Sequence, residues 1–81
     1  MGTYDLLIMY LLDYGPIVGV FRYCLDNGLN YPWTYKQARR AQERGHITIT
    51  RSIDQRGRPD RLELTQRGAL YARSIRPGGA L

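Results

Sequence analysis

The amino-acid sequence predicts a mainly α-helical domain with a small two-stranded β-hairpin, in the order helix, helix, helix, strand, strand, helix. Apolar residues recur with helical spacing, and Gly or Pro interrupts them near positions 15, 28, 45 and 77. The period then changes, because Ile47, Ile49 and Ile53 occupy alternate positions, as in a strand. With 81 residues, we expect one domain over residues 1–76 and a flexible tail over 77–81.

The first helix is predicted from Thr3, a suitable capping residue, to about Tyr14, where Gly15-Pro16 ends it. Its segment Leu6–Leu12 is apolar on nearly all sides. A helix of this kind is either surrounded by other helices or used in a dimer contact.

Pro16 suits the first position of a second helix, which Asn27-Gly28 ends. Gly19 then falls in the middle of this helix, where a close crossing with another helix would explain it. The expected apolar stripe consists of Ile17, Phe21 and Leu25, and Cys24 lies beside it, where we expect a buried thiol.

A third helix is predicted from about Trp33 to Arg44, between the turn at residues 30–32 and Gly45. Residues 47–53 and 61–64 alternate as strands around a polar loop at 54–60. Thr65 suits the cap of a last helix, which continues through Ala69, Leu70, Tyr71 and Ile75.

Positive charge is concentrated in the second half of the chain. The net charge is +5, yet residues 1–35 carry one base and three acids, whereas residues 36–81 carry eleven bases and four acids. This asymmetry indicates a scaffold followed by a surface that binds a polyanion. Eleven of the twelve bases are Arg, whose planar fork suits phosphate and guanine, although the composition of the genome can also produce such a bias.

The third helix carries a stripe of like charges, because Lys36, Arg40 and Arg44 are each four residues apart. On a helical wheel Lys36 and Arg40 lie opposite Ala38, the expected centre of the buried face, and Trp33, Arg44 and Gln37 lie around one side of them. Tyr35, Ala41 and Thr34 lie near Ala38. An external polyanion would relieve their repulsion. The alternative is a solvated face that happens to be charged.

Lys36 or Arg40 suits guanine and Gln37 suits adenine in a major groove, and Thr34 at the helix N-terminus suits a phosphate. Trp33 either contacts a sugar or a thymine methyl group, or packs over the edge of the core with Tyr31. The expected contacts on this helix are Trp33, Thr34, Lys36, Gln37, Arg40 and Arg44.

The hairpin adds more guanidinium groups, with Arg56-Gly57-Arg58-Pro59 at its expected tip. Two Arg beside a Gly suit a narrow groove, and the four residues are similar to the core of AT-hook peptides. The alternative is a polar turn that is basic by chance. The expected contacts on the hairpin are Arg51, Arg56, Arg58 and Arg61.

Three helices followed by a basic hairpin are typical of a winged helix-turn-helix. Gly15-Pro16-Ile17, the segment 33–47 beginning Trp33-Thr34-Tyr35, and Leu64-Thr65-Gln66-Arg67-Gly68 resemble the PadR family of winged-helix repressors. The segment 54–68 is similar to the wing of MarR-type regulators. The resemblance implies a protein that binds duplex DNA through the third helix and the wing, usually as a dimer. The chain departs from it at Ala38 and Ala41, where leucines are usual, and in the short segment after the last helix.

We expect a DNA-binding regulator that is not an enzyme and has no cofactor or metal. His46 is the only histidine, Cys24 is the only cysteine, and the acidic residues are scattered. We also expect no membrane span, no secretion signal and a cytoplasmic location. The expected homodimer uses Leu6–Leu12 together with Leu70, Tyr71 and Ile75.

Two other functions remain open at this stage. A winged-helix module for protein–protein assembly would expose an apolar patch, around Trp33 and Tyr31, and would bind DNA with little dependence on salt. RNA binding is disfavoured, because the sequence offers no row of exposed aromatic residues for stacking on bases.

Overall fold

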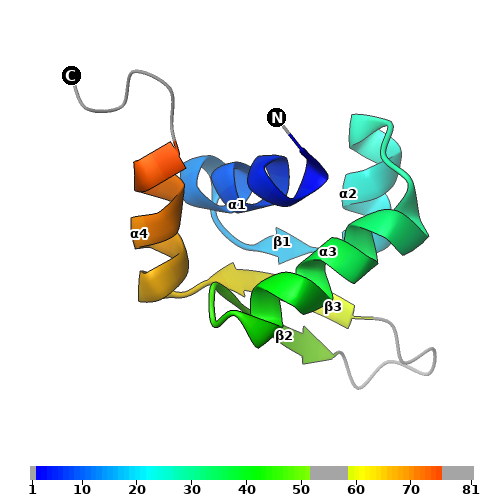
Figure 1. The fold of residues 1–81 in the computed structure, drawn as a ribbon. Helices are drawn as coiled ribbons and strands as arrows, with labels where there is room; N and C mark the ends of the chain where they lie inside the picture. The colour runs from blue at the N-terminus through cyan, green and yellow to red at the C-terminus, as the bar shows by residue number, and fades with distance from the viewer. Residues whose placement is uncertain (1, 52–58, 76–81) are drawn as a thin grey trace.

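The computed structural model describes residues 2–51 and 59–75, and gives the backbone alone at positions 51, 59 and 60. It is mainly helical, with a small three-stranded antiparallel sheet rather than the expected two-stranded hairpin. In Figure 1 the sheet lies beneath α1, α3 crosses in front, and α2 and α4 lie at opposite ends. The elements are α1 (Thr3–Tyr14), β1 (Ile17–Val18), α2 (Val20–Asn27), α3 (Tyr31–Glu43), β2 (Ile47–Arg51), β3 (Pro59–Leu64) and α4 (Gln66–Ile75).

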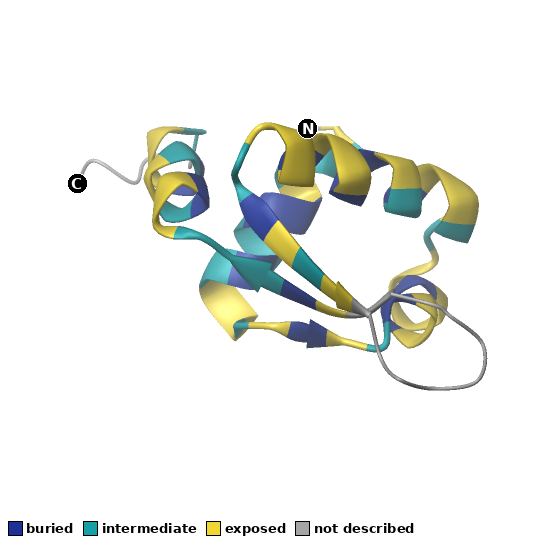
Figure 2. Cartoon of the chain, turned by 90° about the horizontal axis from the view of Figure 1, so that it is seen from below, coloured by how far each residue is buried: buried dark blue, intermediate teal, exposed yellow. Residues whose placement is uncertain are grey.

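The sheet has the strand order β1–β3–β2, so that β3 lies in the middle. Leu62 pairs with Ile17 on one side and with Ile49 on the other. These apolar residues face the helices, while the alternate residues face outward, as the alternating colours along β2 show in Figure 2. The sheet therefore has one face in the core and one face in solvent.

Strand β1 corrects the expectation that Pro16 starts the second helix. Ile17 is buried and pairs with β3, and α2 begins only at Val20. Gly19 is not in the middle of a helix but precedes α2, with a φ of 81° that favours glycine. A strand of two residues is too short to show an alternating pattern, which is why the sequence did not reveal it.

The expected apolar stripe of the second helix was also wrong. Phe21 and Leu25 are 44% and 64% exposed, and α2 instead buries Val20, Tyr23 and Cys24. The predicted stripe counted from Ile17, which lies in β1, so its spacing to Phe21 is not helical. Burial of Cys24 agrees with the prediction.

Several helix ends lie where turn and capping residues predicted them. Helix α1 ends at Tyr14, although Gly2 rather than Thr3 is its N-cap. Helix α2 ends before Gly28, which is left-handed. Helix α3 begins two residues earlier than expected, because the Asn30 side chain accepts a hydrogen bond of 2.9 Å from the backbone N–H of Trp33.

The core takes up most of the apolar segment for which a dimer contact was one explanation. Leu7 and Ile8 of α1 are fully buried within this chain, and Leu11 is nearly so. Among the residues expected in the dimer interface, Leu6 and Leu70 are 45% and 61% exposed, whereas the hydroxyl of Tyr71 donates to Asp5 over 2.7 Å. The homodimer stays a prediction. Among the described residues, every helix is too short or too polar to cross a bilayer.

A close backbone contact joins the turn after α3 to the turn before α4. The hydroxyl of Thr65 donates to the carbonyl of Gly45 over 2.6 Å and accepts from the backbone N–H of Gly68 over 2.9 Å. The N–H of Thr65 donates to the carbonyl of His46 over 3.0 Å. A Cβ at Gly68 would overlap that same carbonyl and come 2.7 Å from Cδ1 of Leu64. Only glycine fits at this position.

The substitution Gly68→Ala therefore destabilises the fold. Alanine favours a helix over glycine by about 1 kcal/mol, but overlap with a hydrogen-bonded carbonyl costs more, and we expect a net loss of about 1–3 kcal/mol. Urea unfolding measures this loss, with Arg73→Ala, an exposed change in the same helix, as a control within about 0.5 kcal/mol of wild type. A Gly68→Ala variant more stable than wild type would contradict the contact.

Candidate nucleic-acid interface

Helix α3 packs on the core through small side chains and exposes its opposite side. Ala38 and Ala41 are fully buried, so the helix axis can lie close to its neighbours. In Figure 2 the exposed side of this helix is turned away from the sheet. The exposed residues of α3 are Pro32, Trp33, Lys36, Arg39, Arg40, Gln42 and Glu43.

Two of the predicted contact residues on α3 are buried instead. Thr34 is fully buried beside the thiol of Cys24, and burial raises the pKa of that thiol, an effect which the Thr34 hydroxyl partly offsets. Gln37 is only 4% exposed, and its Nε2 has no hydrogen-bond partner among the described residues. The buried face is centred closer to Gln37 than expected. Neither side chain is accessible to a base or phosphate, so both predictions need correction.

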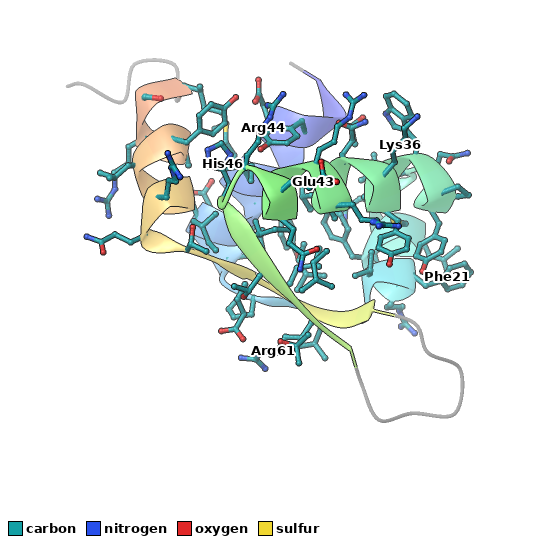
Figure 3. The ribbon with its side chains drawn as sticks, turned by 60° about the horizontal axis from the view of Figure 1, so that its bottom comes forward. Phe21, Lys36, Glu43, Arg44, His46 and Arg61 are labelled. Carbon is teal, nitrogen blue, oxygen red and sulfur yellow. The ribbon has the colours of Figure 1, made fainter. Side chains whose placement is uncertain are left out.

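The outer side of α3 holds three cations and one acid. Lys36, Arg39 and Arg40 are all exposed, with Glu43 on the same outer side of the helix (Figure 3). The ion pairs found among the described side chains lie elsewhere, at Arg22–Asp26 and Arg61–Glu63. Among the described residues, Glu43 is thus the one acid on the exposed side of α3 with these cations. Arg39 was not among the predicted contacts, although a helical wheel places it beside Lys36.

Trp33 belongs to this exposed surface rather than to the edge of the core. Its side chain is 49% exposed, and the Nζ atom of Lys36 lies 5.8 Å from its ring centroid. Tyr31 has other ring neighbours, because it packs against Phe21 at 5.4 Å and Tyr35 at 6.2 Å between centroids. An amphipathic ring therefore lies beside a cation at the start of α3.

Of the four arginines predicted to contact DNA on the hairpin, Arg61 alone has a described side chain. Arg56, Arg58 and the side chain of Arg51 lie outside the described residues. Arg61 is exposed on β3, where Nε donates to Oε1 of Glu63 over 2.9 Å. Since its neighbour Leu62 faces the core, Arg61 faces the outer side of the sheet, and Figure 3 shows it beyond the strands from Lys36. The structure does not bring Arg61 together with the cations of α3.

Arg44, the last predicted contact of α3, lies at the C-terminal end of this helix, beside Tyr4 and near His46. It is exposed, and its guanidinium carbon lies 5.0 Å from the ring centroid of Tyr4. The hydroxyl of Tyr4 is 2.6 Å from Nδ1 of His46, to which it donates when that ring is neutral with its proton on Nε2. His46 also stacks on Tyr71 at 4.6 Å between centroids. The ring of His46 is thus held from two sides.

This environment disfavours the charged form of His46. Burial lowers its pKa from 6.5, and the positive charges of Arg44 and Arg67 lower the pKa further. The sequence showed a single histidine after a glycine, but not that α1 and α4 would meet there. His46 and Arg67 are therefore residues of interest that the sequence alone did not indicate.

The described part of the chain, residues 2–51 and 59–75, contains no pocket and no group of three or more side chains suited to a metal ion. Cys24 is buried in the core. Comparisons with protein-family models, with curated proteins and with solved structures gave no match. On the described surface, the exposed cations of α3 are a group of neighbouring charges without ion-pair partners, and we take them as the candidate site.

Acid should destabilise the free protein through His46. The unfolded chain binds a proton at a pKa near 6.5, whereas the folded chain binds it at a lower pKa. The stability that His46 contributes is therefore present above 6.5 and is lost as the pH falls through the folded pKa.

Urea unfolding of wild type and His46→Gln between about pH 5 and pH 8 measures this effect. Glutamine can still accept a hydrogen bond from Tyr4 but does not titrate, and the carboxylates are common to both proteins. We expect the free energy of unfolding of wild type to fall relative to the variant as the pH falls. A difference independent of pH would contradict the environment assigned to His46.

Proposed function

We propose that this chain is a winged-helix protein that binds duplex DNA, with the outer side of α3 in the major groove. The observation that carries the proposal is the exposed group of Lys36, Arg39 and Arg40, which has no ion-pair partner among the described side chains. Phosphates dominate the affinity of proteins for DNA, and guanidinium groups also pair with guanine in the major groove.

The shape of α3 supports the same partner. A helix with its side chains is about 10–12 Å across, and the major groove is about 12 Å wide. The exposed residues Lys36 and Arg40 are one turn apart, so they suit successive base pairs or a base and a phosphate. Such contacts are typical of sequence-specific binding, and we assign the chain a role as a transcription regulator.

The arrangement of elements also supports the proposal. Three helices precede an antiparallel pair of strands, β2 and β3, which follows α3 after a short turn. This is the layout expected of a winged helix, with β1 as an added strand on the far side of β3. The outer side of α3 is turned away from both the sheet and α1, as a helix that enters a groove requires (Figure 1).

A second function, protein–protein assembly, is favoured by the apolar surface of α2. Phe21, Leu25 and the neighbouring Val18 are 44%, 64% and 68% exposed. This surface differs from the patch expected around Trp33 and Tyr31. An assembly module would bind DNA weakly and with little dependence on salt, so the same titration distinguishes the two functions.

The proposal is tested by titrating a labelled duplex with protein between about 50 and 200 mM salt. Arg40→Gln should weaken binding and reduce the slope of log K against log salt by about 1. Arg22→Gln is the matched control, because it removes the same charge from α2, where Arg22 is paired with Asp26. Salt-independent binding by wild type, or equal effects of the two substitutions, would refute the proposal.

Glu43→Gln should strengthen binding to the same duplex. Its carboxylate lies on the outer side of α3, where it faces the phosphates in the proposed complex, and removing one exposed charge changes a binding energy by roughly 0.2–1 kcal/mol, or about 1.4- to 5-fold. Asp26→Asn on α2 is the control and should leave affinity unchanged. A loss of affinity in Glu43→Gln would mean that Glu43 accepts a hydrogen bond from the bound DNA, against our assignment.

A further inference from the structure

Two arginines lie next to His46 in the chain fold, one where α3 ends and one where α4 begins. Arg44 follows the last residue of α3, and Arg67 lies in the first turn of α4. Arg67 covers Gly45, since a Cβ at that glycine would be 3.5 Å from Cδ and 3.6 Å from Nη1 of Arg67. Both side chains are exposed. Residues separated by more than twenty positions thus place two like charges near the ring of His46.

The ring of His46 lies within the field of both charges. Each of the two arginines lowers its pKa, in addition to the effect of burial. Figure 3 shows Arg44 and His46 together at the end of α3, beside α4. Asp5 is the nearby carboxylate, but its Oδ1 accepts from the hydroxyl of Tyr71 over 2.7 Å. Among the described side chains, neither arginine has an ion-pair partner.

We infer that Arg44, Arg67 and His46 bind a backbone phosphate of the same duplex that α3 reads. The inference rests on the proposed function and extends the contact surface from α3 onto α4. Arg44 follows Arg40 by one helical turn, so the cluster continues the row of cations on α3. Two guanidinium groups match the oxygens of a phosphate in charge and in geometry, and an imidazolium adds a third donor.

A phosphate at this position also couples DNA binding to proton uptake. Its negative charge favours the imidazolium form, so the pKa of His46 rises when the duplex binds. Affinity therefore increases as the pH falls, although acid destabilises the free protein. Among the described residues, the groups that face His46 are Tyr4 from α1, Arg44 from the end of α3, and Arg67 and Tyr71 from α4, and Asp5 of α1 accepts a hydrogen bond from that same Tyr71.

The test compares Arg67→Gln with Arg73→Gln in the duplex titration described above. Both substitutions remove one charge from an exposed position of α4, but a spacing of six positions places the two on different sides of the helix. Arg67→Gln should weaken binding and lower the salt slope by about 1, whereas Arg73→Gln should leave the slope unchanged. Circular dichroism verifies that both variants are folded.

A second measurement follows His46 itself by NMR, which is unambiguous because the chain has one histidine. Its pKa should rise when the duplex is added, and His46→Gln should abolish the increase of affinity at low pH. If Arg40→Gln weakens binding while Arg67→Gln behaves like Arg73→Gln, this inference is wrong and the proposed function stands. If wild type shows no salt-dependent binding, both are wrong.

Discussion

The fold depends on one close backbone contact, between the turn that follows α3 and the turn that precedes α4. Thr65 bonds to the carbonyl groups of both Gly45 and His46, and the missing side chain of Gly68 allows the two turns to meet. Strand β2 begins after the first turn and β3 ends before the second, so the contact holds these two strand ends together. The contact thereby helps to set the orientation of α3 relative to the sheet, and with it the direction in which the exposed side of α3 points.

The exposed cations of α2, of β3 and of the outer side of α3 differ in whether they have an ion-pair partner. Arg22 and Arg61 each have an acidic partner, and both lie away from the outer side of α3. Lys36, Arg39 and Arg40 have none among the described side chains. Exposed ion pairs contribute little to stability. Whether a cation is paired therefore matters more for binding than for folding. Unpaired exposed cations on the outer side of α3 are available to an anionic partner, which is the basis of the proposed function.

Sequence reasoning predicted the features that depend on local chemistry. Asn27-Gly28 and Gly45 end helices, and Thr65 begins one, because capping and left-handed backbone are properties of single residues. The sequence did not reveal β1, because Ile17 shows its strand character only through its pairing with Leu62.

The candidate site was predictable only in part. Exposure of Lys36 and Arg40 followed from the helical period, but a modest rotation of α3 decides whether Gln37 lies inside or outside, and tertiary packing sets that rotation. The cluster around His46 was beyond prediction for a similar reason. Tyr4 and Tyr71 contact His46 from distant positions in the sequence, and no local sequence pattern predicts such contacts.

The strand order has a consequence for association between chains. Because β3 is paired on both sides, the sheet has two edges, and β1 contributes only two residues to one of them, between Pro16 and Gly19. Proline lacks the N–H group that a new neighbour would need, so this edge is blunted. The five residues of β2 form the longer edge, with a strand neighbour on one side only among the described residues. Among the described strands, β2 therefore offers the longer row of backbone groups for strand addition.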